Sequence, residues 1–389
     1  MDTAVTTPAG PPVGLTLAGC NSSVLYLYGP HTFRLLRGGR LISVVDIDAA
    51  RAREACALLG AQRWHTDFEQ ALEDDAVEAA VLATPGWLHE PQTVAAARAG
   101  KHVLCEKPMA RTVEECDRMI AACEDAGVTL MIAHMKRFHR AFRKVRELIE
   151  GGVLGDVFAV RGQWDEPARD LGADGTFRGD PRSLGGQWHD HGAHMSDLAC
   201  WWLDSPAKRV NGVIRSVGEH MIAAEDFAIA TLDHENGAVS CHQTTTQTYR
   251  PWYETYEVMG NRGTLLVQAT RHTSLSFEPP TLSLYDQTEG HFNARVVDVT
   301  PYLGFEIDRE TQAANQYLQE LEHFCGCVRL GKEPLVTAAM GRHAVEIINA
   351  AYLSHFRGAW VDLPLRDSGE LADCFRQYRE TQRRRRGHS

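Results

Sequence analysis

The first third of the chain alternates short apolar runs with stretches of helical periodicity. Apolar runs predict strands at residues 13–18, 41–46, 79–83, 102–105 and 129–133, and apolar side chains recur at helical spacing over 49–59, 89–99 and 113–126. Gly60, Gly100 and Gly127 each follow a predicted helix, where a left-handed stop is expected. Strands and helices that alternate in this way predict a doubly wound parallel sheet covered by helices.

The pattern changes after Gly155. Strands separated by turn signals are predicted at residues 157–164, 227–232, 238–246, 253–259 and 264–267, with one helix over 188–203 among them. Residues 310–330 and 337–356 return to helical periodicity, and we expect them to pack back on both domains. We therefore predict an α/β protein with a flexible leader over 1–12, a doubly wound domain over 13–136, a second α/β domain with a large, mainly antiparallel open sheet over 137–365, and a tail over 366–389.

Length and charge agree with a globular protein of two domains. A chain of 389 residues exceeds the size at which one core normally stops growing. The net charge of -11 disfavours nucleic-acid partners, because phosphates attract clustered Lys and Arg. The run Arg383 to Arg386 is the one basic exception, and we interpret it as a solvated tail. Small molecules are the expected partners.

Cysteines and the leader bear on the compartment. The ten cysteines include no CxxC pair, and Cys325 and Cys327 have no histidine or second pair at metal-ligand spacing. Residues 1–12 lack the basic start and apolar stretch of a signal peptide, and no apolar run reaches the length of a bilayer span. These features predict reduced thiols, no membrane partner and a cytoplasmic location.

The first strand runs into Gly19-Cys20-Asn21-Ser22-Ser23, where a dinucleotide pyrophosphate would meet a helix N-terminus. The glycine fingerprint is incomplete, because Asn21 occupies the second glycine position and Val24 the third. Asn is the residue with a side chain that best tolerates a left-handed backbone. Taken alone, an ordinary strand-to-helix turn explains this loop equally well.

Asp46 adds a second indication, at the end of the next strand. An acidic side chain there accepts hydrogen bonds from the adenosine ribose and repels a 2'-phosphate, which favours NAD over NADP. The alternative is that Asp46 or Asp48 only caps the following helix.

Further motifs identify a family. Thr84-Pro85 with His89, followed by residues 99–108 with Glu106-Lys107-Pro108, resembles the Gfo/Idh/MocA family of oxidoreductases, named after glucose-fructose oxidoreductase and inositol dehydrogenase. Further matches follow in order at Arg137-Phe138, Gly185-Gly186, Asp190, Gly192, His194, Asp197, 334–337 and 351–354. The resemblance covers about residues 13–365, although family members usually have glycine at the position of Asn21.

The resemblance implies an N-terminal Rossmann domain that binds NAD and a C-terminal α/β domain whose open sheet commonly makes homodimer or homotetramer contacts. It also implies an enzyme that transfers hydride between NAD and a secondary alcohol of a sugar, glycoside or polyol, with oxidation of a pyranoside at C3 as one form. The cofactor residues that we expect are Gly19, Cys20, Asn21, Ser22, Ser23, Asp46, Thr84, Pro85, His89, Glu106, Lys107 and Arg137.

Oxidising an alcohol requires a proton acceptor and a positive group beside the developing alkoxide. Asp190 and His194 stand four residues apart in the predicted helix, so they project from one face, and Lys107 follows a parallel strand. We assign His194 as proton acceptor, Lys107 as the group that polarises the oxygen, and Asp190 as an orienting group. Individually, each could be a surface charge or a local pair.

Other residues suggest substrate contacts. The expected substrate residues are Lys107, Trp164, Arg178, Asp190, His191 and His194. Large aromatic residues such as Trp164, Trp188 and Trp252 are more often core than sugar platforms, and the loop over 165–184 is either a lid or a solvated segment. Although His191, Asp190 and His194 suggest a metal site, no HExxH pattern accompanies them, and we predict no metal.

Two alternative functions share this fold. One is reduction of a keto sugar or an imine in a biosynthetic pathway. The other is a regulator without catalysis, as in the yeast galactose-pathway repressor, although Lys107, Asp190 and His194 would then serve no purpose.

Overall fold

The computed structural model describes residues 10–167, 180–218, 224–270, 280–286, 295–299, 316–365 and 367–385. The chain divides into two compact units, each built on its own sheet. Unit 1 comprises Met1–Ala110, Glu114–His139 and Glu306–Arg342; unit 2 comprises Arg111–Val113, Arg140–Phe305 and His343–Ser389.

Unit 1 contains a parallel sheet of six described strands in the order β3-β2-β1-β4-β5-β6. The strands are β1 (Val13–Ala18), β2 (Gly39–Val45), β3 (Arg63–His65), β4 (Ala79–Leu82), β5 (His102–Glu106) and β6 (Leu130–Ala133). The strand order reverses between β1 and β4, and open sheets of this kind bind ligands at the carboxyl ends of the strands beside that point. The predicted doubly wound sheet is confirmed.

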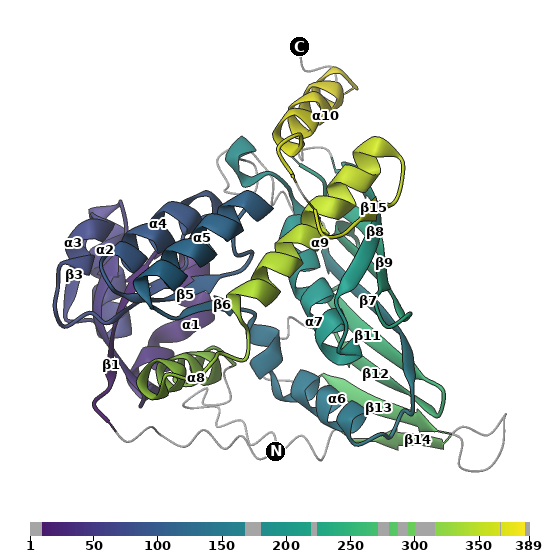
Figure 1. Ribbon diagram of the computed structural model, residues 1–389, viewed down its shortest axis with the longest axis horizontal. Coiled ribbons are helices and arrows are strands. Elements are labelled where there is room, and N and C mark those ends of the chain that lie inside the picture. Colours follow the sequence, from purple (N-terminus) through teal and green to yellow (C-terminus); the bar gives the residue numbers. More distant parts are fainter. Residues whose placement is uncertain are drawn as a thin grey trace. The chain divides into compact units, whose positions relative to one another are not determined.

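Helices connect these strands. They are α1 (Ser22–Leu35), α2 (Ala49–Leu59), α3 (Phe68–Leu72), α4 (Gly86–Arg98) and α5 (Val113–Ala126), followed by the 3-10 helix η1 (Met135–Phe138) and α8 (Gln316–Leu330). Gly60, Gly100 and Gly127 have φ values of 77°, 70° and 66°, so the predicted left-handed stops are present. Helix α8 comes late in the chain, yet it packs against α1 (Figure 1).

Unit 2 contains a sheet of nine described strands in the order β14-β13-β12-β11-β7-β10-β9-β8-β15. The strands are β7 (Val157–Pro167), β8 (Ala207–Arg215), β9 (Phe227–His234), β10 (Val239–Thr248), β11 (Tyr253–Gly260), β12 (Gly263–Ala269), β13 (Thr281–Asp286), β14 (Arg295–Asp298) and β15 (Val361–Asp362). Neighbours pair antiparallel, apart from β7 and β10. The mainly antiparallel sheet that the sequence predicts is therefore confirmed.

The described helices of unit 2 are α6 (Arg140–Glu150), the 3-10 helix η2 (Pro181–Ser183), the π-helix η3 (Trp188–Gly192), α7 (Ala193–Leu203), α9 (Ala338–Arg357), which begins in unit 1, and α10 (Leu371–Arg385). Of these, α6, α7 and α9 lie on the same side of the sheet (Figure 1). Buried residues alternate along β9, as a sheet with one packed face requires. Phe142, Trp202 and Tyr256 form part of the core of this face.

Three helical segments of unit 2 differ from the expectations. Residues 140–150 form α6, because Ala141, Phe142 and Val145 make one buried face. Residues 371–385 form α10 instead of part of a tail, since Phe375 is buried and packs edge-on against the ring of Tyr352 at 4.8 Å. The predicted helix over 188–203 begins with a π-helical turn and becomes α-helical only at Ala193.

Candidate active site

The turn after β1 is shaped by Gly19. This residue has a φ of +95°, and a Cβ atom there would lie 2.5 Å from the carbonyl oxygen of Ala83. Only glycine combines that backbone conformation with so close an approach of the loop after β4. The turn thus brings bare backbone to the carboxyl edge of the sheet, which suits a pyrophosphate group.

Asn21 begins α1 in a different way from the expected one. Its backbone is extended, with a φ of -69°, and its side-chain oxygen accepts a hydrogen bond from the Val24 N–H at 3.0 Å. Asn21 is therefore an N-cap, and it does not use a left-handed conformation. The backbones of Ser22 and Ser23 form the first turn of α1, while their side chains lie outside the described residues.

Asp46 links the end of β2 to the turn after β1. Its carboxylate accepts hydrogen bonds from the Cys20 N–H at 3.0 Å and the Asp48 N–H at 2.9 Å, and it pairs with Arg51 at 2.9 Å. Burial would raise the pKa of Asp46, but the bonds from Arg51 and the two amides lower it below its usual value. Asp48, and not Asp46, caps α2, by accepting from the Ala50 N–H.

Cys20 is buried, and burial together with the charge of Asp46 raises the pKa of its thiol to about 12. Its backbone N–H is the group that takes part in this network. All ten cysteines of the chain are free thiols.

His89 joins the two loops that follow β4 and β5. Its ring is 2% exposed, and its nitrogens face the Thr84 carbonyl at 2.8 Å and the Pro108 carbonyl at 3.0 Å. Burial lowers the pKa of His89, although both carbonyl oxygens oppose this effect. Pro85 lies at the N-cap of α4, directly after Thr84. His89 therefore sets the spacing of these loops.

Glu106 ends β5 at the carboxyl edge of the sheet, and Lys107 directly follows it. The Tyr28 hydroxyl donates to one Glu106 oxygen at 3.3 Å, and the Lys107 N–H donates to the other at 3.2 Å. The peptide bond between Lys107 and Pro108 is cis, and the Lys107 side chain is half-buried. Glu320 on α8 is buried nearby, and burial together with the charge of Glu106 raises its pKa well above the usual range.

Arg137 lies in η1 and is buried. Its guanidinium donates to the Leu335 carbonyl and to the Met340 sulfur, both at 3.4 Å. The described contacts of Arg137 thus hold η1 against the segment after α8 and against the first turn of α9, within unit 1.

In unit 2, Asp190 and His191 lie in the π-helical turn η3, and His194 lies in the first turn of α7. His191 and His194 are buried, whereas Asp190 is half-buried. One ring nitrogen of His191 lies 3.0 Å from a Glu166 oxygen, and the other lies 2.9 Å from the Thr244 hydroxyl. Since π-helical turns are often found at functional sites, this one singles out the start of α7.

The three tryptophans in this region are core residues. Trp164, Trp188 and Trp252 are 2%, 0% and 8% exposed. The indole of Trp164 stacks on the ring of His191 at 3.8 Å with an interplanar angle of 15°. Because Trp164 is buried and stacks on His191, its role in this unit is to orient the His191 ring.

The predicted loop contacts are only partly described. The predicted substrate residue Arg178 belongs to residues 168–179, which lie outside the described residues. Arg182 forms a two-pronged ion pair with Asp180, with the shortest distance 2.6 Å.

Several buried charged residues are not predicted from the sequence. Glu166 lies beyond the predicted end of its strand, because the regular apolar alternation stops at Trp164. Glu225 lies before the predicted start of β9, and Glu320 lies in α8. Each of the three has a polar or charged residue directly beside it, so no apolar stretch marks it as buried.

Metal ligation and membrane insertion both find no counterpart among the described residues. Across the described ranges, no three His, Cys, Asp or Glu side chains are grouped so that they could hold a metal ion. Nor does any helix within the described residues have the length and apolar character of a bilayer span.

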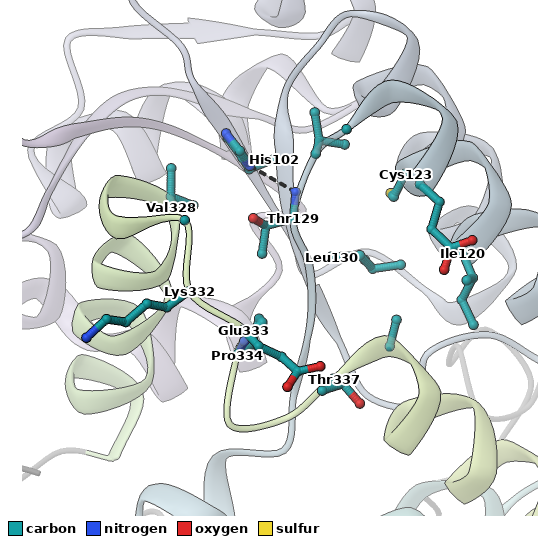
Figure 2. Close-up of a pocket in the computed structure, with 15 residues that line it drawn as sticks. His102, Ile120, Cys123, Thr129, Leu130, Val328, Lys332, Glu333, Pro334 and Thr337 are labelled. Atoms are coloured by element: carbon teal, nitrogen blue, oxygen red, sulfur yellow. Dashed lines mark hydrogen bonds between the residues drawn. The ribbon is translucent and has the colours of Figure 1, made fainter.

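A cavity of about 460 Å³ lies at the opposite edge of the sheet of unit 1. Figure 2 shows His102 and Thr129 beside it, and the Thr129 N–H donates to His102 Nδ1 at 2.9 Å. These residues stand at the amino ends of β5 and β6. Ligands of such sheets bind at the carboxyl ends, so this cavity is separate from the candidate cofactor site.

Lys107 belongs to unit 1, whereas Asp190 and His194 belong to unit 2. Within unit 1, the structure brings Gly19, Cys20 and Asp46 into one network. Within unit 2, it places Asp190, His191 and His194 in consecutive turns.

Known proteins resemble both units. An oxidoreductase family domain with an NAD-binding Rossmann fold matches residues 17–134, and the GFO/IDH/MocA C-terminal domain matches residues 142–266. The scyllo-inositol 2-dehydrogenase (NAD(+)) of Bacillus subtilis is 25% identical over 345 residues, which cover 88% of this chain and 94% of that protein. The 1,5-anhydro-D-fructose reductase of Ensifer adhaerens is 32% identical over 232 residues, or 59% of this chain and 68% of the reductase.

A solved structure agrees with these matches. The aldose-aldose oxidoreductase from Caulobacter crescentus, complexed with glycerol, superimposes with a TM-score of 0.78 at 25% identity, and the match covers 91% of this chain and 100% of that one. The resemblance found in the sequence is confirmed, and the chain belongs to the GFO/IDH/MocA family of NAD-binding oxidoreductases.

Proposed function

We propose that this oxidoreductase transfers hydride between NAD and a secondary alcohol carbon of a sugar, glycoside or polyol. The observation that carries the proposal is the position of Lys107, which directly follows β5 at the edge of the sheet where such folds bind ligands. The names of the inositol dehydrogenase and the aldose-aldose oxidoreductase support the substrate class.

The residues of unit 1 fit a dinucleotide. Gly19 exposes backbone where a Cβ atom would collide with Ala83, and Asp46 directly follows β2 with its carboxylate fixed by backbone amides. A fixed negative charge there disfavours a 2'-phosphate, which supports NAD rather than NADP. When bound, NAD supplies the nicotinamide ring that accepts or returns the hydride. We propose that Thr84, Pro85, His89, Glu106 and Arg137 shape the walls of this site.

Side chains of the protein would accept the substrate proton and stabilise the charge that develops on the substrate oxygen. His194 would take the hydroxyl proton of the substrate, since histidine is the side chain that titrates nearest to neutral pH. The Lys107 ammonium would stabilise the developing alkoxide, and Asp190 would orient the hydroxyl or His194. His191, held by Glu166 and Thr244 and stacked on the buried Trp164, would contribute to the substrate wall.

Reduction of a carbonyl is the second candidate. The reductase from Ensifer adhaerens, at 32% identity, favours it. The same residues would serve, with His194 donating the proton and Lys107 polarising the carbonyl oxygen. The measured direction of turnover separates the two candidates.

We also propose a homodimer or homotetramer formed through the sheet of unit 2. The helices of that unit cover one face, and the other face carries half-buried residues such as Ile229, Gln243 and Thr255. A sheet face that no helix covers in a single chain is a common site of self-association. Light scattering of the purified protein gives the mass directly.

The test of the function follows absorbance of the reduced nicotinamide while NAD is mixed with a panel of glycosides and polyols. We expect turnover with at least one member of the panel, and a kcat about 100-fold or more lower for Lys107→Met and His194→Ala. Lys332→Met and His355→Ala are matched controls that should retain the rate, because both residues lie outside β5, η3 and α7. Folded Lys107→Met and His194→Ala proteins that turn over at the wild-type rate contradict the assignment.

A further inference from the structure

Glu225 receives an unusual concentration of hydrogen bonds. It is 0% exposed, and its carboxylate accepts from the Gly186 N–H at 2.9 Å, the Trp188 N–H at 2.7 Å and the Tyr352 hydroxyl at 2.8 Å. The Gln187 N–H donates to the Glu225 main-chain carbonyl at 3.0 Å. Three consecutive backbone N–H groups, from residues 186 to 188, therefore all end on Glu225.

These amides begin the helix that carries the proposed catalytic groups. The first N–H groups of a helix have no partner inside it, so an external acceptor decides how the helix starts. The Asp190 N–H already donates back to the Gly186 carbonyl at 3.2 Å, which places the start of η3 directly at the segment bound to Glu225. The negative carboxylate also interacts favourably with the positive end of the helix dipole.

The glycine pair fits this clamp. A Cβ atom on Gly186 would lie 2.1 Å from the Glu225 carbonyl oxygen. Gly185 has a φ of +147°, and a Cβ atom there would lie 2.5 Å from the Tyr352 hydroxyl. The two glycines are therefore explained by the close approach of Glu225 and Tyr352 to the chain.

Burial opposes the charge that these donors favour. It raises the pKa of Glu225 to about 7, although the bonds from Tyr352, Trp188 and Gly186 lower it. The hydroxyl of Tyr352 remains protonated, because burial and the charge of Glu225 raise its pKa well above the usual value. Two of the three donors to the carboxylate are backbone N–H groups, so Glu225 holds the backbone of residues 186 and 188 in place.

We propose that Glu225 is a positioning residue, which fixes the turn over residues 186–188 and through it the orientation of Asp190 and His194. It acts through other residues and has no contact with substrate in this role. The proposal rests on the proposed function, because that function gives Asp190 and His194 their catalytic roles.

Glu225→Gln is the principal variant. It keeps the size of the side chain but replaces one acceptor oxygen with an NH2 group, which would face an N–H or O–H donor. Tyr352→Phe removes one of the three bonds and should give an intermediate effect. Glu346→Gln is the matched control, since Glu346 is buried in unit 2, accepts from the Leu365 N–H at 2.8 Å and pairs with His343 at 2.9 Å.

Hydrogen exchange of the full-length protein tests the positioning directly, without substrate. Amides over residues 186–194 should exchange at least tenfold faster in Glu225→Gln, by a smaller factor in Tyr352→Phe, and at the wild-type rate in Glu346→Gln. Unchanged exchange in Glu225→Gln overturns the proposal, whatever reaction the enzyme performs.

Kinetics test the consequence. With the substrate identified by the panel, we expect the kcat of Glu225→Gln to fall at least tenfold, because a displacement of about 1 Å can cost up to a hundredfold in rate. The deuterium isotope effect on kcat should rise, since hydride transfer becomes slower relative to other steps, whereas a partly unfolded sample leaves it unchanged. The Kd for NADH, from fluorescence titration, should stay within twofold.

The two failures are distinguishable. Faster local exchange with an unchanged kcat and isotope effect overturns the positioning role, while the function stands. A wild-type protein that turns over no member of the panel counts against the proposed function, and the exchange result still decides whether Glu225 holds the turn.

Discussion

Replacing Gly19 with alanine tests the geometry of the cofactor turn. At a φ of +95°, a residue with a side chain costs roughly 1–2 kcal/mol. The added Cβ atom would lie 2.5 Å from the Ala83 carbonyl oxygen, whereas ordinary contacts begin near 3.4 Å, so the loop after β4 must move. Forcing a well-packed neighbour to shift costs about 1–3 kcal/mol. We therefore expect Gly19→Ala to lower the free energy of unfolding of unit 1 by about 2–5 kcal/mol.

Two other glycines of unit 1 separate the cost of the positive φ from the cost of the close contact. Gly100 has a φ of +70° with nothing within 4 Å of a Cβ atom, so Gly100→Ala measures the backbone cost alone. Gly86 has equally open space and no positive φ, so Gly86→Ala should be close to neutral. Hydrogen exchange of β1 and β4 peptides in increasing urea gives the unfolding free energies, and fluorescence titration gives the Kd for NADH, which Gly19→Ala should weaken most. If Gly19→Ala costs no more than Gly100→Ala, the close approach to Ala83 has no energetic weight and our reasoning is wrong.

Two further predictions concern charge. Asp46→Ala removes the carboxylate and releases Arg51, so the ratio of NADPH affinity to NADH affinity should rise about tenfold or more. Asp48→Ala is the control: it removes the N-cap of α2, so it should cost about 1 kcal/mol of stability and leave the affinity ratio unchanged. Burial, aided by His234, lowers the pKa of His242 to about 3, so its contribution to stability is complete above pH 6.5 and is lost as the pH falls toward 3. His242→Gln should reduce the loss between pH 6.5 and 5 by up to about 1.4 kcal/mol per pH unit in urea titrations, and an identical slope contradicts this.

The parallel sheet could be predicted because its strands are short, apolar and buried on both faces. The segments at 13–18 and 102–105 agree with β1 and β5 to within one residue. The sequence does not predict β3, since Arg63 and Trp64 are exposed, His65 is half-buried, and the three residues provide no apolar run. Periodicity detects burial, and an edge strand of three residues is not buried.

The second sheet was harder to predict from the sequence. β8 was missed because its buried positions are filled by Ala207, Val210, Gly212 and Ile214, and a shift of register separates the first two. Helix α10 was missed because most of its residues are polar, and only a few apolar side chains such as Leu371 and Phe375 attach it to the core. In both cases the tertiary partner supplies what the local pattern lacks.

The candidate site was predicted unevenly for a related reason. Motifs identify Lys107, Asp190 and His194 because their chemistry resides in their side chains. The groups that hold the site act instead on backbone, which every residue possesses: Asp46 accepts from the Cys20 N–H, His89 faces two carbonyl oxygens, and Glu225 accepts from residues 186–188. Glu225 lies 39 positions from Gly186 and binds its backbone N–H, so no spacing of residue types in the sequence indicates the contact.

The π-helical turn η3 shows how a partner that binds backbone can change the direction of side chains. Four-residue spacing places Asp190 and His194 on one face of a regular helix, but a π-helical turn holds more residues than an α-helical turn and alters their relative direction. The angle between these two side chains is therefore set by how the helix begins, which depends on Glu225 and the glycine pair before it. Transferring Asp190 and His194, the two proposed catalytic residues, alone into another scaffold should accordingly fail to reproduce their geometry unless the acceptor at residue 225 is transferred with them.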